Sequence, residues 1–386
     1  MKFVFGAFIL CSISISAYGV EYLTQSFEAT SNFQLMHKNQ FSPVDLFEHS
    51  FGESLAVRSI SEFDFDKIQA QFHIQGQQTY IEPDTLLPYF TKNEFRLTQI
   101  NNDNPKFATQ IDRANVSFAT GNFEWIIGRQ PLSVGVAKMA NISQIYQPSD
   151  YNWLSNGYGY GVDAINVNYY LGTNDLIKAA FLLNKLDDSQ NSMAYLKYKT
   201  MLRDQDVSVM LQKTQSVYAL NTTVDAYLGN HALWAEVSLF WFDDENIKPN
   251  NNIRATFGAD YAYKDLYGQV EYHFNGMGCK QIKSCTNPPR FNEYKYTGQG
   301  LSANHYVFVN NNYSVTDLTN LTLVNIVNVL DPAVMNQVIW SVSQNDHFDY
   351  SFMVSNSVVF VDDEIRSQHE FSLIPLMGSA TLNFYF

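Results

Sequence analysis

The chain has 386 residues and a formal net charge of −14, with 16% charged and 15% aromatic residues. The acidic balance argues against nucleic acid as a partner, because phosphate binding needs clustered Lys and Arg. Low charge with abundant Tyr and Phe is typical of strands whose aromatic side chains meet lipid. After the N-terminus no stretch reaches 18 apolar residues, so the sequence predicts no membrane-spanning helix.

The first 19 residues have the pattern of an export signal. Lys2 supplies a positive charge, an almost wholly apolar stretch follows over 3–15, and Ala17-Tyr18-Gly19 provides small residues for cleavage. A membrane anchor is the alternative, but the apolar stretch is short and no stop-transfer flank follows it. We therefore expect a signal peptide over 1–19 that is cleaved after Gly19, and a single domain over 20–386.

Apolar and polar residues then alternate with a period of two along most of the chain, which predicts β-strands. We predict eighteen strands, and sixteen fit the pattern nearly as well. The eighteen are 22–37, 54–65, 68–80, 107–119, 123–130, 161–170, 175–184, 191–200, 206–213, 217–228, 231–242, 254–263, 266–274, 301–313, 317–328, 335–344, 348–360 and 376–386. Alternation alone does not separate a two-sheet sandwich from a closed barrel.

The connections between these strands fall into two sets of different length. Short turns are expected at 66–67, 120–122, 171–174, 229–230 and 264–265. Longer connections are expected at 38–53, 81–106, 131–160, 243–253, 275–300 and 361–375. Short turns at one end and long loops at the other are typical of transmembrane barrels. The sequence therefore predicts an all-β fold: a closed antiparallel transmembrane β-barrel with short periplasmic turns and long extracellular loops.

The polar faces of these strands predict the inner wall of the barrel. Hydrocarbon offers the backbone no hydrogen bonds, so a sheet in lipid must close, and a closure of eighteen strands encloses water. We therefore expect the inward polar side chains to be solvated by water and to line a pore. These candidates are Gln69, Gln71, His73, Gln75, Arg113, Asn115, Glu236, Gln269, Glu271 and His273.

A more specific pattern spans residues 112–165. It contains Asp112-Arg113, then Gly128-Arg129-Gln130, Gln147-Pro148-Ser149-Asp150 and Gly161-Val162-Asp163. The pattern resembles a hairpin and loop of Gram-negative outer-membrane porin-like proteins, the group of specific porins and alginate-export channels. This resemblance implies a barrel in which a loop dips inward and narrows the pore.

The loop that the resemblance singles out is 131–160. A loop of this length in a compact protein is usually functional, and a plain surface loop is the alternative. Its candidate residues for narrowing the pore are Lys138, Tyr146, Asp150 and Trp153. Arg113 and Arg129 lie near strand ends and could pair with Asp150 or Asp163, and we favour an ion pair that pins the loop over contact with solute.

Carboxylates on the predicted inner face give an expectation about ions. A ring of carboxylates favours cations, which predicts a weak cation preference, and simple wetting of the wall is an equal alternative. The residues concerned are Glu62, Asp64, Glu236, Glu271 and Asp349. Acidic runs in the loops, such as 243–245, could take up divalent ions that bridge lipopolysaccharide phosphates, but such runs are more often solvated loop tips.

Cys279 and Cys285 are close in sequence, within a stretch rich in Gly and Pro. In an exported protein this spacing predicts a disulfide that closes a small loop. A metal site that adds His273 is the weaker alternative, because two Cys and one His make a poor zinc set. We expect neither a metal nor another cofactor.

The last strand supports the same interpretation. Leu382, Phe384 and Phe386 share one face, and the chain ends on an aromatic residue with no polar tail. A last strand of this kind is expected to pair with the first and to face lipid. We expect it to be the signal that the barrel-assembly machinery reads after periplasmic chaperones deliver the chain.

Together these features predict a passive outer-membrane channel, a porin, for small polar solutes in a Gram-negative cell, in contact with outer-membrane lipid and lipopolysaccharide. An outer-membrane barrel enzyme is one alternative, although none of the eight His residues lies in a known catalytic motif. A structural or adhesin barrel without conductance is the other. A homotrimer is compatible with the aromatic outer face, and no enzymatic activity is expected.

Overall fold

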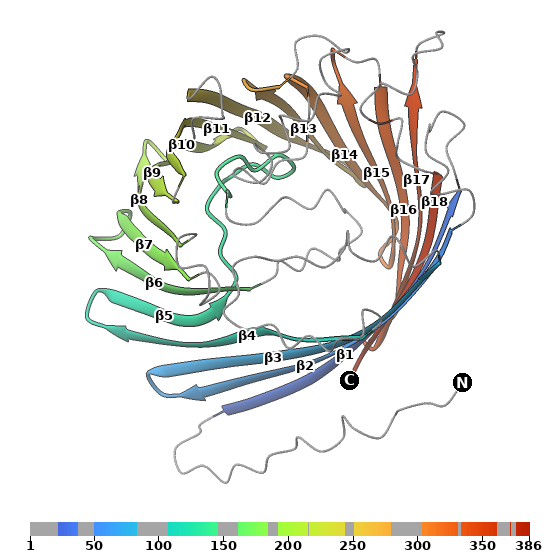
Figure 1. Ribbon diagram of the computed structural model, residues 1–386, viewed down its shortest axis with the longest axis horizontal. Coiled ribbons are helices and arrows are strands. Elements are labelled where there is room, and N and C mark those ends of the chain that lie inside the picture. Colours follow the sequence, from blue (N-terminus) through green and yellow to red (C-terminus); the bar gives the residue numbers. More distant parts are fainter. Residues whose placement is uncertain are drawn as a thin grey trace.

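The computed structural model describes residues 22–37, 50–82, 107–145, 161–183, 192–214, 216–243, 251–278, 301, 303–330, 333–360, 371 and 376–386. These residues form one sheet of eighteen antiparallel strands (Figure 1). The strands are β1 (Tyr22–His37), β2 (Ser50–Phe65), β3 (Ile68–Glu82), β4 (Phe107–Thr120), β5 (Phe123–Gln130), β6 (Val162–Tyr170), β7 (Leu176–Leu182), β8 (Met193–Leu202), β9 (Gln205–Lys213), β10 (Val217–Leu228), β11 (His231–Phe242), β12 (Asn251–Tyr263), β13 (Leu266–Asn275), β14 (His305–Thr316), β15 (Thr319–Asn328), β16 (Ala333–Asn345), β17 (Phe348–Val359) and β18 (Leu376–Tyr385).

The sheet closes because β1 pairs with both β2 and β18. The last residue takes part in the closure: Phe386 N–H donates to the Phe27 carbonyl at 2.9 Å, and Phe27 N–H donates to the Phe386 carbonyl at 3.0 Å. The closed antiparallel barrel and its eighteen strands are thus confirmed, and sixteen is wrong. No helix in the described ranges is long and apolar enough to cross a membrane.

The outward face of the barrel carries a continuous apolar belt. Strand register places Val116 beside Ile127, Ile127 beside Ile165 and Ile165 beside Phe181. Each of these four side chains keeps 40–45% of its surface exposed. All strands in the described part of the chain belong to one closed sheet, so the alternative of a two-sheet sandwich is wrong, and the belt has the composition that hydrocarbon favours.

The tight turns lie at one end of the barrel and take the left-handed backbone conformation. Asp66, Arg203, Asp204 and Lys264 have positive φ angles between 50° and 64°. Left-handed residues match the twist of two paired strands, which is why two-residue hairpins need them. The expected short turns at 66–67, 229–230 and 264–265 are therefore present.

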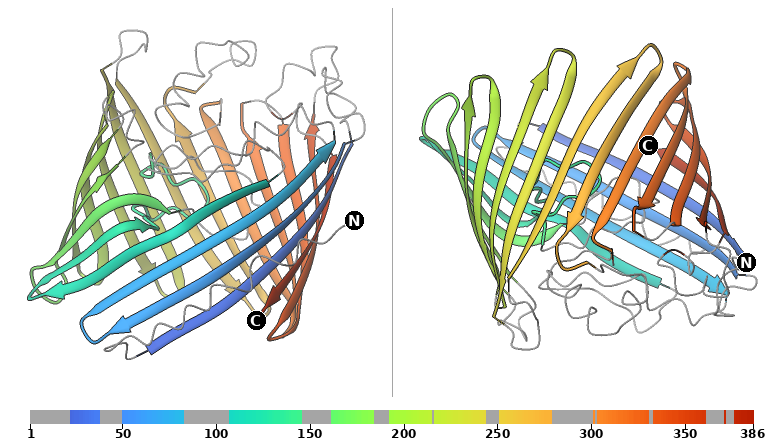
Figure 2. Two further views of the ribbon diagram at one scale, coloured as in Figure 1. Left: turned by 60° about the horizontal axis from the view of Figure 1, so that its bottom comes forward. Right: turned by 90° about the horizontal axis from the view of Figure 1, so that it is seen from above.

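Wall height differs around the barrel. The strands run obliquely around it (Figure 2), and β1 and β2 have 16 residues each. By contrast β5, β6 and β7 have 8, 9 and 7 residues. The segment 131–145 leaves the wall at the end of β5 and runs into the barrel interior (Figure 1).

The interior is partly packed rather than wholly wet. Two apolar clusters combine segment 131–145 with inward side chains of the wall: Leu132, Val134 and Ile145 belong to one, Met139 and Ala140 to the other. The wall supplies Met193, Met210, Phe240 and Phe242 to the first and Tyr306, Phe308 and Ile326 to the second. The expectation that inward positions are solvated throughout is therefore wrong over this side, because the inserted segment replaces water.

Candidate functional site

The inserted segment begins where the sequence motif places a glycine. Gly128 has a φ of 116°, and a Cβ at this position would lie 2.2 Å from the Ala114 carbonyl oxygen. Only glycine tolerates that backbone and that approach. Gly128 therefore allows the close approach of β5 to Ala114 of β4, three residues before the inserted segment begins.

Arg129, on β5, joins the foot of the segment to the two neighbouring strands, β4 and β6. Its Nε and Nη2 donate to the two carboxylate oxygens of Asp163 at 2.9 and 2.6 Å, and its Nη1 donates to the Ile111 carbonyl at 2.7 Å. Asn115 Nδ2 donates to the Arg129 carbonyl at 2.9 Å. Arg129 and Asp163 thus form an ion pair, one of the pairings considered from sequence, and it joins β5 to β6 where segment 131–160 leaves and returns.

Arg113 and Asp112 complete this foot. Arg113 Nη1 donates to the Asp112 carboxylate at 3.1 Å, and Gly161 N–H donates to Asp112 Oδ1 at 3.3 Å. A Cβ on Gly161 would lie 2.1 Å from the Asp112 carbonyl oxygen. The described motif residues Asp112, Arg113, Arg129, Gly161 and Asp163 therefore lie together at the base of the loop, whereas 147–150 lie outside the described residues.

Glu236 holds the first turn of the inserted segment. One carboxylate oxygen accepts hydrogen bonds from the N–H groups of Val136 and Ala137, the latter at 2.8 Å. The other accepts from Ile142 N–H at 3.2 Å, and from N–H and Oγ of Ser143 at 3.3 and 3.2 Å. All five partners are donors, which suits an ionised carboxylate.

Glu271 holds the middle of the segment in the same way. Its two oxygens accept the N–H groups of Lys138, Met139 and Ala140 at 2.5, 3.0 and 2.8 Å. Trp234 Nε1 donates a fourth hydrogen bond at 2.6 Å. Glu236 and Glu271 have no exposed surface, and most of the hydrogen bonds that their carboxylates accept come from the segment.

The carbonyl groups of the segment are bound by other wall residues. Lys197 Nζ donates to the Val134 carbonyl at 2.7 Å, Gln212 Nε2 to the Ser143 carbonyl at 2.8 Å and Thr256 Oγ1 to the Ala140 carbonyl at 3.0 Å. Donors and acceptors from β8, β9, β11, β12 and β13 thus fix both kinds of backbone group. We call residues 131–145 the docked loop and β8–β13 the docking wall.

The opposite side of the interior has a polar wall, on which some side chains, such as Glu62 and Gln69, are exposed. Arg58 forms an ion pair with Glu28 at 3.0 Å and donates to Gln75 Oε1 at 3.1 Å. Gln71 Nε2 donates to Glu62 Oε1 at 3.2 Å. We call this side, formed by β18 and β1–β4, the open wall.

Strand register places the ten expected pore-lining residues on the inner face, in two environments. Gln69 and Gln71 lie on the open wall with exposed or half-buried side chains, whereas His73, Gln75, Arg113 and Asn115 are largely buried there in the hydrogen-bonded network. Gln269 lies near the start of β13 and has a half-buried side chain. Glu236, Glu271 and His273 have no exposed surface, because the docked loop and its neighbours cover them. We therefore reassign these three from lining a pore to supporting the loop.

Lys138 is the described loop candidate and has an exposed side chain, with its Nζ 5.7 Å from the centre of the Trp234 ring. Tyr146, Asp150, Trp153, Cys279 and Cys285 lie outside the described residues. Sequence reasoning missed the anchors Lys197, Gln212 and Thr256. A signal was present: inward Met210, Phe240 and Phe308 break the apolar-out pattern and mark a dry part of the interior.

The described residues contain no group of three His, Cys, Asp or Glu side chains placed to hold a metal ion. Three buried side chains of metal-ligating type, Glu236, Glu271 and His273, each have another partner. Glu236 and Glu271 bind the loop, and His273 Nδ1 lies 3.1 Å from Thr256 Oγ1.

Several solved structures share this fold. Acinetobacter baumannii OccAB1 matches with a TM-score of 0.58 and 12% identity over 95% of this chain and 97% of that chain. Acinetobacter baumannii OccAB2 matches with a TM-score of 0.58 and 7% identity over 96% and 99%. Pseudomonas aeruginosa OccK8 (OprE) matches with a TM-score of 0.55 and 9% identity over 96% and 99%. No protein-family model and no curated protein sequence matches the chain. At these identities the likeness shows the fold, and the barrel expected from the porin resemblance is confirmed.

Proposed function

We propose that the protein is a passive outer-membrane channel for small polar solutes in a Gram-negative cell. One observation carries the proposal: the docked loop is fixed against one wall, while Glu62 and Gln69 on the open wall keep exposed side chains. A wet path between the docked loop and the open wall is what a diffusion channel needs. The apolar outer belt and the likeness to OccAB1 and OccK8 support the same conclusion.

Conductance tests this proposal directly. Purified protein reconstituted into planar bilayers should give stepwise ionic currents, and liposome swelling with solutes of graded size should show a cut-off. Absence of current would favour the alternative of a structural or adhesin barrel. Hydrolysis of phospholipid or peptide by the detergent-solubilised protein would favour the alternative of a barrel enzyme.

The path would be weakly cation-preferring. Glu62, Asp64 and Asp349 remain on the inner face without a tie to the docked loop, whereas Glu236 and Glu271 are committed to it. Arg58 and Lys138 partly offset the carboxylates. Reversal potentials in a salt gradient should therefore show a small preference for cations, and a preference for anions would contradict this part of the proposal.

The surroundings of the channel belong to the same proposal. Cleavage after Gly19, delivery by periplasmic chaperones and insertion by the barrel-assembly machinery would precede its work among outer-membrane lipid and lipopolysaccharide. N-terminal sequencing of protein from the envelope fraction tests the first step, and truncation of Phe386 tests the assembly signal. A disulfide between Cys279 and Cys285 is tested by a mass shift on reduction, and a homotrimer by sedimentation in detergent.

A further inference from the structure

Three asparagines lie side by side on the neighbouring strands β15, β16 and β17 (Figure 1). Register places Asn325 opposite Asn336, and Asn336 opposite Asn356. Ile326 and Ser355, which adjoin the row in sequence, are 2% and 0% exposed and face the interior, so the asparagines face outward. Asn356 is exposed. We call these three asparagines the amide row.

The amide row lies within an apolar part of the outward face. The outward rows on either side of it contain only leucine and valine. They are Leu323, Val338 and Val354 toward the tight turns, and Val327, Val334 and Val358 toward the other end of the barrel. Hydrocarbon gives an amide no hydrogen-bond partner, so amides inside such a face are unfavourable until another polar group meets them.

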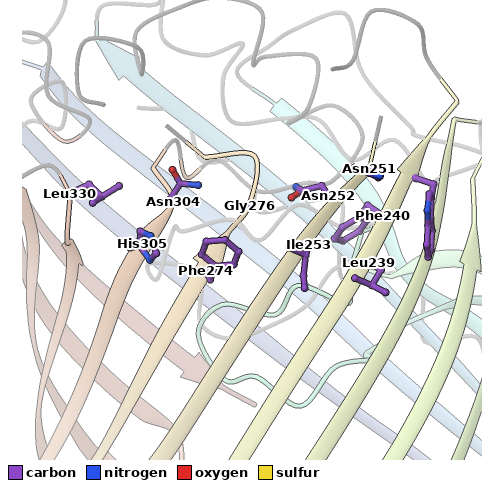
Figure 3. A pocket seen from close by; sticks show the side chains of 11 residues that line it. Leu239, Phe240, Asn251, Asn252, Ile253, Phe274, Gly276, Asn304, His305 and Leu330 are labelled. Carbon is purple, nitrogen blue, oxygen red and sulfur yellow. The ribbon is translucent and has the colours of Figure 1, made fainter. Parts of the chain in front are cut away.

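The outward face of nearby strands shows the apolar composition that lipid requires. Figure 3 shows Leu239, Ile253 and Phe274 on β11, β12 and β13. Register places Leu239 beside Ile253, and Ile253 is 43% exposed. The amide row therefore distinguishes the sector β15–β17 from that face.

A row of carboxamides is complementary to a second row of the same kind. Each carboxamide has two N–H donors and an oxygen that can accept two hydrogen bonds. Within the described part of the chain, one hydrogen bond joins the row, from Asn325 Nδ2 to Asn336 Oδ1 at 2.7 Å. That bond uses one donor and one acceptor, so the row can still donate to and accept from a partner outside the barrel.

The surface around the amide row also suits contact with a copy of itself. From Leu321 to Val327 on β15, Val334 to Val342 on β16 and Tyr350 to Val358 on β17, every outward residue is Val, Leu, Phe, Tyr, Trp or Asn. Two copies of this surface would bring no like charges together. The second apolar cluster, which includes Ile326 and Val359, packs against the inner face of the same strands. Two copies would therefore meet across an uncharged wall that is supported from inside.

We propose that a second copy of this chain packs against β15–β17, with the two amide rows hydrogen-bonded to each other across a two-fold axis, an inference that rests on the proposed outer-membrane location. An axis along the membrane normal keeps both rows at the same depth, and a two-fold contact brings the same face of both copies together. Asn336, on the middle strand, would lie beside its own counterpart, and Asn325 would lie beside Asn356 of the other copy. A three-fold ring joins two different faces, so this contact favours a homodimer over the homotrimer named above.

Disulfide crosslinking of the full-length protein in isolated outer membranes tests this symmetry. Asn336→Cys alone should give a crosslinked dimer, because the axis brings the residue to its counterpart. Asn325→Cys and Asn356→Cys should each crosslink weakly alone and strongly when both are present in one chain. Within one chain these two positions are two strands apart, about 9–10 Å, which is too far for a disulfide between them.

Two controls accompany the crosslinking. Ile165→Cys, on the outward face of β6 and 40% exposed in the wild type, should give no dimer. The wild-type chain, which keeps Cys279 and Cys285, gives the background.

Sedimentation equilibrium in detergent tests the amides themselves. The triple variant Asn325→Val, Asn336→Val and Asn356→Val should dissociate at least about tenfold more readily, because it removes several hydrogen bonds between the copies. Thr222→Val is the matched control, since Thr222 lies between Val209 and Val237 on the outward face of β10, and it should leave the dimer unchanged. Valine suits a lipid-facing position, so heat-modified mobility on gels should show folded barrel for both variants.

Absence of a crosslink at Asn336→Cys, or equal crosslinking at Ile165→Cys, would overturn the proposal, as would a trimer that the triple variant leaves intact. A monomer that carries an amide-linked lipid, lost in the triple variant, would overturn it in favour of lipid on this face. The channel proposal is judged separately by conductance. Current from protein that does not crosslink removes only the dimer, and a crosslinked dimer without current removes only the channel.

Discussion

Glu236 on the docking wall and Glu62 on the open wall show how differently two sides of one barrel use the same residue. Both lie on the inner face of a strand. Glu236 has no exposed surface and accepts five hydrogen bonds from the docked loop, whereas Glu62 is exposed and accepts one from Gln71. An inward carboxylate is therefore a loop anchor or a wet wall residue according to what lies against it.

The position and the backbone groups of the docked loop explain why Glu236 is buried and Glu62 is exposed. A backbone segment in the interior needs partners for its N–H and C=O groups, and the docking wall supplies carboxylates for the first and Lys, Gln and Thr side chains for the second. Among the described residues, no such segment lies against the open wall, and its polar side chains pair with one another. Three changes test this comparison, and a fourth tests a turn that lies outside both walls.

The largest effect is expected for the double variant Glu236→Gln and Glu271→Gln. Each amide group would face backbone N–H donors, and hydrogen bonds to charged groups are worth about 1.5–3 kcal/mol each. The docked loop should detach, so single-channel conductance and its noise should rise while stability to urea falls. The matched control is Glu62→Gln with Asp349→Asn on the inner face away from the loop, and equal conductance changes in the two pairs would contradict the comparison.

Gly128→Ala should act at the foot of the loop. The φ of 116° and the 2.2 Å approach to the Ala114 carbonyl make a Cβ unfavourable, at a cost of about 1–3 kcal/mol for the strained backbone alone. Heat-modified mobility on gels should show less folded barrel. Gly172→Ala, where nothing lies within 4 Å of the added Cβ, should fold normally; equal yields of the two variants would refute the structural role of Gly128.

Arg58→Gln should change ion preference more than stability. Its ion pair with Glu28 is partly exposed, and such pairs contribute at most about 1 kcal/mol. Removal of the positive charge leaves Glu28 uncompensated on the open wall, so the reversal potential should move toward cation preference. Lys264→Gln, in a tight turn, removes the same charge away from the lumen, and a similar shift there would show that the open wall does not set selectivity.

The smallest effect is expected at Asp175, which lies in the turn before β7 and belongs to neither wall. Hydrogen bonds from Thr200 and Tyr198 lower the pKa of Asp175 below its ordinary 3.8. A lowered pKa stabilises the fold above 3.8, and the contribution is lost as the pH falls through the shifted value. Asp175→Asn should therefore be slightly less stable than the wild type at neutral pH, and the difference should vanish in acid, as measured by urea unfolding. A difference in stability that stays the same at all pH values would contradict the hydrogen bonds assigned to the Asp175 carboxylate.

Much of the barrel was accessible from sequence because strand alternation is a local property. The eighteen strands follow from period-two runs such as those around Phe72 and Val270, and the foot of the loop from the Gly-Arg-Gln and Gly-Val-Asp motifs. The start of β14 was placed at 301 instead of His305, because the apolar residues before it pack into the interior and resemble a strand face.

The anchors of the docked loop could not be predicted in the same way. Val136 and Glu236 are 100 residues apart in sequence, and Lys138 and Glu271 are 133 apart. The only local sign is the inward apolar residue Phe240 on the strand of Glu236, and it does not say which remote segment the carboxylate binds.

The sequence by itself determined which side chains face outward and which inward, since a residue's side of a strand depends only on its place in the alternation. The tertiary structure alone decided which inward side chains are dry. Burial depends on where a remote segment comes to rest, and that position is set by hydrogen bonds and apolar contacts between residues far apart in the chain.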